Sequence, residues 1–443
     1  MSQTELARNV IVSPSYLSLI ESGRRPASEA VLEAVSKHLD VPRAHLLTGQ
    51  PLPAPSSSAD DLDLKFAEMA LRNGDATTAR QRYESILAAS PPLGVDGSAA
   101  TFEARLGLAR ALEAQGDLVG ALEAIELALS ALERQDTSTA DELVRLGLYV
   151  ASCRLYRESG DLARAIEVGE AALTTLPSES SDNPSALEIE VQVVSTLAGC
   201  YFERGDLTRA HLLTKSALAR ADAPEALPLA RAAAYWNASL VAEARGDRAD
   251  AHRFVDRARA IYSESDNQRA LALLKLVSGW LILQDPEPDL ERAERLIESA
   301  LGQLPMVGTE VDIAYGEIEL ARCRMLAGAP EEALLLAEAA LGRLNGGAHL
   351  QEARARLTLG QAKLLIGDHA DALKVFTAAA HDLRALGADR QAAAAWRELA
   401  ELLSALGMTD EALDAYRQAT DAAGVNLPPA QVSPALHAAR RRP

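Results

Sequence analysis

Small polar and basic side chains are concentrated in two short segments near the start of the chain, residues 2–7 and 13–26. The hydroxyl groups of Ser13, Ser15 and Ser18 can hydrogen-bond to base edges, and basic side chains such as Arg24 can contact phosphates. This chemistry is recognition by hydrogen bonding, since no nucleophile in these segments has a neighbouring base. The side chains can act together only if a helix presents them along one face.

Local sequence signals predict a helix, a turn and a second helix over these segments. Ser2 caps the first helix, and Glu5 three residues later completes a capping box. Ser13 caps the second helix, which has Pro14 at its first position and ends at Gly23. The stripe that this helix buries is formed by Tyr16, Leu17 and Ile20.

A third helix is expected from Ser28, with its apolar residues inward, and a short last one over residues 42–47. The pattern S-x-x-Y-L-S-x-I-E-x-G-x-R-P, together with these helices, resembles the Xre family of lambda-repressor-like DNA-binding domains over residues 1–50. The resemblance implies five helices. The family's third helix lies in the major groove and corresponds here to the helix that Ser13 caps. The resemblance also implies that Gln3 lies against the DNA backbone or a base edge, and that the groove-facing positions are Ser13, Pro14, Ser15, Ser18 and Leu19. Arg24 and Arg25 follow the helix and are expected to meet phosphates.

Three features depart from the Xre pattern. The family's first helix has no counterpart before Met1, so either the true start lies upstream or the domain is incomplete. Ile11 occupies the turn where the family favours glycine, and a β-branched residue tolerates a positive φ poorly. The groove-facing set also lacks an Arg, Asn or Gln that would read a base with two hydrogen bonds, which makes specificity depend on shape or dimer spacing.

Composition favours an all-α protein, because aromatic residues make up only 4% of the 443 residues while Ala and Leu dominate. No apolar run long enough to span a membrane and no signal peptide are found, which predicts a cytoplasmic protein without a membrane partner. The three cysteines, Cys153, Cys200 and Cys323, lie far apart and are expected to be buried structural residues.

Charge is distributed unevenly along the chain. Residues 1–50 carry five basic and five acidic side chains, so the whole net charge of −19 belongs to residues 51–443. Such an acidic region repels a phosphate backbone, and duplex DNA must therefore be bound by residues 1–50. A Pro/Ser-rich linker over residues 51–60 separates the two parts.

Residues 61–423 are periodic, and residues 424–443 form an irregular C-terminal tail. A glycine at a predicted turn recurs about every forty residues, at Gly74, Gly116, Gly160, Gly205, Gly246, Gly328, Gly367 and Gly407. Five residues after each glycine stands an alanine, at Ala79, Ala121, Ala165, Ala210, Ala251, Ala333, Ala372 and Ala412. Seven residues before each glycine is a small residue, which lets antiparallel helices approach closely.

This register resembles the tetratricopeptide repeat and implies an α-solenoid of about nine helical hairpins, one of them disturbed around residues 285–288. In such a solenoid the first helix of each hairpin lines the concave side. The partner-binding residues expected there are Arg110, Arg154, Arg157, Trp236, Asn237, Arg322 and Gln361.

Two interpretations of these concave-face residues remain open. Arg110, Arg154 and Arg322 recur at one repeat position and can form a basic strip for a peptide carboxylate, or they can pair with acids such as Glu113 and Glu158. Trp236 and its neighbour Asn237 can hold an extended peptide, or Trp236 can be packed between hairpins.

No catalytic constellation is found. The eight histidines show no metal-binding spacing, and phosphate-binding glycine loops and nucleophile motifs are absent, so neither an enzyme nor a cofactor is expected. The combination resembles cytoplasmic transcription regulators of Gram-positive bacteria. It implies a homodimer that binds double-stranded DNA and senses a peptide or protein through its solenoid. The alternative is a protein-interaction scaffold with a non-functional helix-turn-helix remnant.

Overall fold

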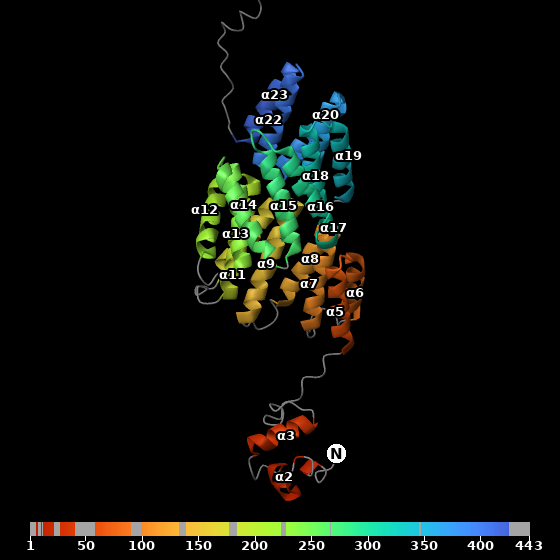
Figure 1. The fold of residues 1–443 in the computed structure, drawn as a ribbon, viewed down its shortest axis with the longest axis vertical. Helices are drawn as coiled ribbons and strands as arrows, with labels where there is room; N and C mark the ends of the chain where they lie inside the picture. The colour runs from red at the N-terminus through yellow and green to blue at the C-terminus, as the bar shows by residue number, and fades with distance from the viewer. Residues whose placement is uncertain are drawn as a thin grey trace, which may run out of the picture. The chain divides into compact units, whose positions relative to one another are not determined.

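The computed structural model describes residues 6–7, 10, 12–21, 27–39, 58–89, 99–132, 139–176, 184–222, 227–265, 267–344 and 347–424. All regular structure among these residues is helical (Figure 1). The chain divides into two compact units, residues 1–65 and 66–443. The expected all-α fold is therefore confirmed for the described part of the chain.

In the first unit, α2 (Pro14–Glu21) and α3 (Glu29–Leu39) form where the sequence predicts the second and third helices. The hydroxyl of Ser13 accepts a hydrogen bond of 3.1 Å from the backbone N–H of Tyr16, which is the expected N-cap. Ala7, Val10 and Leu17 are buried, so even this small unit has an apolar centre.

The second unit is a solenoid of helical hairpins. Its first four hairpins are α5 (Ser58–Arg72) with α6 (Ala76–Ala89), α7 (Ala99–Ala114) with α8 (Leu118–Leu132), α9 (Thr139–Ser159) with α10 (Leu162–Thr174), and α11 (Pro184–Arg204) with α12 (Leu207–Ala221). The next two are α13 (Pro228–Ala244) with α14 (Arg248–Ser263) and α15 (Gln268–Leu283) with α16 (Leu290–Leu301). A short helix, α17 (Leu304–Val307), precedes the last three: α18 (Glu310–Leu326) with α19 (Pro330–Arg343), α20 (His349–Leu365) with α21 (His369–Ala385), and α22 (Asp389–Ala405) with α23 (Thr409–Ala422).

The described residues thus form nine hairpins, as the repeat spacing predicts, including the disturbed one. Helix α5 begins at Ser58, so the expected linker over residues 51–60 extends too far by three residues.

The Gly-Asp pair of the first hairpin shows how a turn of the repeat is formed. Gly74 has a φ of 79°, which L-residues with a side chain rarely adopt, and it ends α5. The backbone N–H of Asp75 then bonds to the carbonyl of Ala70, while its carboxylate accepts a hydrogen bond from the N–H of Thr78 at 3.0 Å. In this turn glycine ends the first helix and aspartate caps the second. Asp117, Asp161 and Asp206 cap their helices in the same way, whereas Asp247 and Asp368 make no such side-chain hydrogen bond.

The small residues of the repeat are buried at the contact between helices. The eight alanines that follow the turn glycines by five residues are all at most 4% exposed. A side chain larger than these would separate helices that pack at close range. The repeat pattern is therefore a packing pattern, and it sets the curvature of the solenoid.

The solenoid curves enough for one turn of the superhelix to contact the next turn of the superhelix. Gly116, at the turn of the second hairpin, faces Glu310 at the start of the seventh, since a Cβ placed at Gly116 would lie 3.5 Å from the Glu310 Cβ. Gly205 faces Arg390 in the same way, with a corresponding distance of 2.9 Å to the Arg390 Cβ. Hairpins five apart in sequence are therefore neighbours across successive turns.

An apolar cluster joins these two turns. Buried side chains of α7, α8 and α9 pack with Val311 and Ile318 of α18, Leu344 at the end of α19 and Ala355 of α20. Burial of apolar surface between segments so distant in sequence stabilises the superhelix as one body. The first helices of the hairpins are thereby fixed around a shared inner surface.

Candidate functional site

The inner surface is formed by the first helices of the hairpins, which pack on one another along the solenoid and meet again across its turns. All seven expected partner-binding residues lie on these helices. Arg110 is on α7, Arg154 and Arg157 are on α9, Trp236 and Asn237 are on α13, Arg322 is on α18 and Gln361 is on α20. The structure distributes them between several distinct polar clusters.

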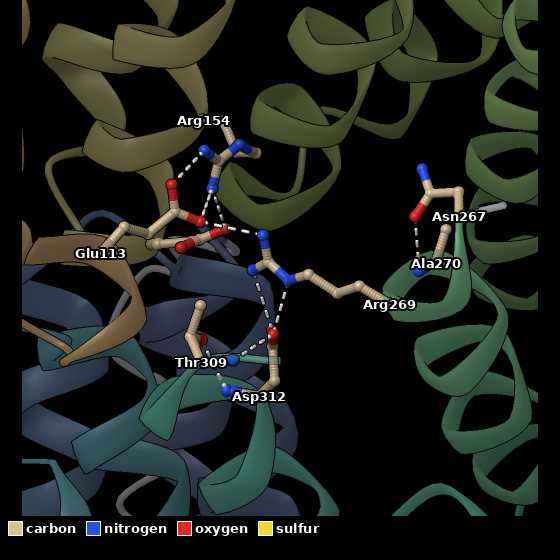
Figure 2. A network of polar contacts seen from close by, with 8 residues as sticks. Glu113, Arg154, Asn267, Arg269, Ala270, Thr309 and Asp312 are labelled. Carbon is tan, nitrogen blue, oxygen red and sulfur yellow. Dashed lines mark hydrogen bonds and ion pairs between the residues drawn. The ribbon is translucent and has the colours of Figure 1, made fainter. Parts of the chain in front are cut away.

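The first cluster joins four helices through Glu113, Arg154, Arg269 and Asp312 (Figure 2). Arg154 donates to both carboxylate oxygens of Glu113, with Nη1 to Oε1 at 2.8 Å and Nη2 to Oε2 at 2.7 Å. Arg269 Nη1 donates to the same Glu113 Oε1 at 3.0 Å. Its Nε and Nη2 also hold Asp312 at 2.6 and 3.2 Å.

Local sequence determines how Asp312 and Arg269 are oriented. Thr309 and Asp312 form a capping box at the start of α18, in which the Thr309 N–H donates to Asp312 Oδ2 at 2.9 Å. Asn267 caps α15 by accepting from the N–H of Ala270 at 3.0 Å, which places Arg269 in the first turn (Figure 2). Two helix starts therefore aim their charged side chains at Glu113.

The cluster also fixes the ionisation of Glu113. Burial on its own raises the pKa of this carboxyl, but the guanidinium groups of Arg154 and Arg269 outweigh burial and lower its pKa to about 2. Glu158 accepts from Arg154 Nη1 at 3.1 Å, so two arginines face three carboxylates. The cluster is a stabilising cross-link with little spare positive charge.

Of the two interpretations of Arg110, Arg154 and Arg322, a basic strip of three free cations does not hold for Arg154 and Arg322. Arg154 pairs with Glu113 and Glu158, as the second interpretation expected, and Arg322 pairs with Glu319 at 3.3 Å. Arg110 has no ion pair or hydrogen bond with another described residue. It lines an open polar pocket of about 650 Å³ together with Glu113 and Arg269.

Arg157 and Asn237 meet over Gly199 of α11. A Cβ at Gly199 would lie 2.5 Å from Arg157 Nη1 and 3.2 Å from Asn237 Oδ1, so the missing side chain makes room for both groups. Asn237 Nδ2 donates to the Ala233 carbonyl at 3.1 Å, which fixes the amide. Arg157 forms no ion pair with a described residue. We call Arg157, Gly199 and Asn237 the glycine site.

Trp236 is packed against apolar side chains of neighbouring helices. Its half-buried ring packs against the apolar cluster formed by α13, α14 and α15. This is the arrangement that the second interpretation of Trp236 expected. Asn237, the next residue on α13, therefore contributes to the inner surface separately from the tryptophan.

A second cross-turn cluster links α11, α20 and α22. Arg354 Nη2 donates to Glu203 Oε2 at 2.7 Å, and Arg354 Nε donates to Gln391 Oε1 at 2.8 Å. Gln391 Nε2 closes the triangle by donating to Glu203. Glu203 lies one helical turn beyond Gly199 on α11, so this cluster adjoins the glycine site.

Sequence reasoning missed Arg269, Asp312, Gly199, Glu203 and Arg354. Their signal is weak, because a charged residue on a first helix looks like an ordinary solvated residue. Arg269 and Glu113 become partners only through the contact between turns, which local spacing does not encode. Gly199 differs from the turn glycines because it stands inside a helix, and this position could have indicated a close approach.

In the first unit, the expected groove-facing residues that are described lie on or beside α2. Ser13, Pro14, Ser15, Ser18 and Leu19 are all exposed, whereas Leu17 is buried. Gln3, Arg24 and Arg25 lie outside the described residues. Helix α2 therefore presents a mostly polar face that is free of core packing.

In the part of the chain that the structure describes, no group of three or more His, Cys, Asp or Glu side chains has the geometry to hold a metal ion. None of its helices combines the length and apolar character needed to cross a membrane. Cys153, Cys200 and Cys323 are all buried free thiols, as expected.

Comparisons with known families agree with the two-part organisation. Residues 1–46 match the helix-turn-helix family, and residues 64–137 match the tetratricopeptide repeat family. A search of curated protein sequences finds no relative of this chain.

Among solved structures, a Rap protein complexed with competence and sporulation factor is similar in fold, with a TM-score of 0.57 and 13% identity over 83% of this chain and 98% of the other. Aspartyl phosphate phosphatase F from Bacillus subtilis matches with a TM-score of 0.45 and 12% identity over 86% and 100% of the chains. PlcR from Bacillus thuringiensis, in complex with the peptide PapR7 and DNA, matches with a TM-score of 0.38 and 15% identity over 59% and 89%. The last two differ too much in shape to inform the site. The chain thus contains a segment that matches the helix-turn-helix family over residues 1–46 and an α-solenoid in which residues 64–137 match the tetratricopeptide repeat family.

Proposed function

We propose that this protein is a DNA-binding transcription regulator whose solenoid senses a peptide. The observation that carries the proposal is the glycine site, where Arg157 has no ion-pair partner and Asn237 Oδ1 lies beside it on the inner surface. A guanidinium group binds a carboxylate with two hydrogen bonds, and a fixed amide oxygen accepts from a peptide N–H. The site therefore suits the carboxyl end of a peptide chain.

The DNA-binding part of the proposal rests on α2 and on the distribution of charge. Helix α2 exposes Ser13, Ser15 and Ser18, whose hydroxyls can donate to or accept from base edges. Residues 1–50 have no net charge, whereas the remainder carries −19, so contacts with phosphates are confined to the first unit. Gln3, Arg24 and Arg25 are proposed to complete this surface.

The solenoid fold supports the ligand-binding part of the proposal. The Rap protein of similar fold holds competence and sporulation factor, so a solenoid of this kind can accommodate a ligand. We further propose a homodimer, because dimeric readers place two recognition helices in successive major grooves. A ligand on the inner surface would then alter how two DNA-binding units are spaced.

DNA binding is tested by selecting duplexes from a random pool with the full chain at low salt. The proposal expects selected duplexes to bind with an affinity that falls steeply as salt rises, because phosphate contacts release counterions. Sedimentation of the same protein then reports whether the bound species is a dimer. Failure to select any duplex at low salt would favour the scaffold alternative, which the neutral charge of residues 1–50 also favours.

A further inference from the structure

Four side chains on the inner surface of the last three hairpins form a group rich in hydrogen-bond acceptors. We call Glu319 and Arg322 of α18, Gln361 of α20 and Glu398 of α22 the acceptor cluster. Arg322 Nη1 donates to Glu319 Oε1 at 3.3 Å. Glu398 lies within interaction range of both Gln361 and Arg322. The cluster thus spans three successive first helices.

Two acceptors of this cluster are buried without a donor. Glu319 is 2% exposed, and its Oε2 has no hydrogen-bond partner. Gln361 is 8% exposed, and its Oε1 has no partner either. Buried polar atoms are nearly always satisfied in native structures, so two orphan acceptors in one cluster require a donor that arrives from elsewhere.

The cluster also lacks positive charge, just as it lacks hydrogen-bond donors. Glu319 and Glu398 are two carboxylates that share Arg322, and Glu398 is also within range of Arg397, which pairs with Glu401 at 3.9 Å. The other guanidinium within range of Glu319 belongs to Arg354, which already holds Glu203 and Gln391. Burial raises the pKa of both Glu319 and Glu398 despite the opposing effect of Arg322, so compensation is incomplete.

The cluster is open to a ligand through Glu398, which is partly exposed although its carboxyl is partly desolvated, while Glu319 lies beneath the surface. It also adjoins the glycine site across the inner surface. Glu203 is one helical turn from Gly199 and bonds to Arg354, and Arg354 in turn influences Glu319. The same surface therefore offers a basic site for a carboxylate of the ligand and an acidic site for a cation of the ligand.

We propose that the acceptor cluster binds an alkylammonium or guanidinium group of the peptide, namely its amino terminus or a basic side chain. Such a group supplies two or more N–H donors and one positive charge, which are what the cluster lacks. The inference rests on the proposed function and adds an orientation, with the ligand carboxylate at Arg157 and its cation at Glu319 and Glu398. Water is the alternative donor, and water gives no preference for basic ligands.

The test uses the full chain, a pool of random heptapeptides with free termini, and spermidine as a cationic probe that is not a peptide. Peptides that co-elute with the protein at low salt are sequenced by mass spectrometry. We expect them to be about tenfold enriched in Lys and Arg over the pool, since one charge-assisted contact changes binding by about that factor. Glu398→Gln and Glu319→Gln should abolish the enrichment, whereas Glu411→Gln, on the exposed surface of α23, should retain it.

The possible outcomes separate the two proposals. Peptides retained without enrichment in basic residues overturn the acceptor-cluster inference and leave peptide sensing intact. If no peptide is retained, the peptide-sensing proposal is contradicted. The melting temperature with spermidine then tests the acceptor-cluster inference on its own. A rise in melting temperature with spermidine that Glu398→Gln removes would support a free amine as the ligand, and no rise would overturn the cationic site. Because Glu398 is partly exposed, its variant keeps the test valid even if Glu319→Gln does not fold.

Discussion

Arg269 of α15 donates a hydrogen bond of 3.0 Å to Glu113 of α7, although 156 residues separate them in the sequence. The same guanidinium holds Asp312 of α18, so one side chain connects three hairpins of two successive turns. Arg354 and Glu203, 151 residues apart, repeat this arrangement between α20 and α11. Cross-turn ion pairs are thus a recurring way in which this solenoid fixes its inner surface.

Replacement of Glu113 by glutamine should destabilise the solenoid strongly. The change leaves Arg154 and Arg269 without the carboxylate that both of them bind, and removing one partner of a buried ion pair costs about 3 kcal/mol. The free energy of unfolding in urea measures the effect. Glu291→Gln, at a carboxylate whose side chain is 88% exposed, is the matched control and should change stability little. A similar small effect for both variants would contradict the role assigned to Glu113.

Stability should also fall in acid because of Glu113. Its pKa is about 2 in the fold and 4.5 ordinarily, so the ionised carboxylate stabilises the fold fully above pH 4.5. The contribution disappears as the pH falls from about 4.5 to about 2 and amounts to about 3 kcal/mol. The free energies of unfolding of the native protein and of Glu113→Gln should therefore approach each other as the pH falls through this window. A constant difference between the two free energies would show that Glu113 is not the titrating group.

The repeat architecture was readable from the sequence because its signals are local. Gly74 must adopt a positive φ, Asp75 caps the following helix and Ala79 packs where no larger side chain fits, all within six residues. The same is true of Ser13 and α2 in the first unit. Element type and the number of hairpins follow from such short-range rules.

The polar clusters were not readable, because they depend on curvature summed over five hairpins. Arg110, Arg154 and Arg322 occupy one repeat position, yet Arg154 meets Glu113 and Arg322 meets Glu319, while Arg110 has no partner among the described residues. Arg154 pairs with the adjacent hairpin and Arg322 with its own helix, whereas the next turn of the solenoid brings Arg269 to Glu113 and Arg354 to Glu203. A small error in the curvature predicted for each hairpin would add up over five hairpins and change every cross-turn pair.

Filling the glycine site should impair ligand binding without unfolding the solenoid. In Gly199→Ala the new Cβ would lie 2.5 Å from Arg157 Nη1, so the flexible arginine side chain must move away. Peptides retained by the native protein should bind at least about tenfold more weakly to this variant, since one charge-assisted contact is lost. Calorimetric titration measures the change.

Gly342→Ala provides the control for the glycine site, because a Cβ there would meet no atom within 4 Å. It should bind peptide as the native protein does. If Gly199→Ala binds equally well while Arg157 is displaced, the glycine site is not where the ligand carboxylate lies.

A carboxylate on α2 should prevent DNA binding. Ser15 is exposed on the face assigned to the major groove, and Ser15→Asp would bring a negative charge toward the phosphates and base acceptors. Fluorescence anisotropy with a selected duplex should show a loss of at least about tenfold in affinity. Ser263→Asp, which makes the same change at an exposed position of α14, should bind normally. Equal binding by both variants would place the DNA surface elsewhere.

The central claim is that the inner surface of the solenoid controls the DNA-binding unit. It is tested most directly by measuring the Kd of the full chain for a selected duplex with and without a saturating retained peptide. The account predicts a change in Kd of about tenfold, a typical coupling between two sites, and predicts that Arg157→Ala abolishes this change while leaving the Kd without peptide unaltered. The same Kd with and without saturating peptide would contradict the account.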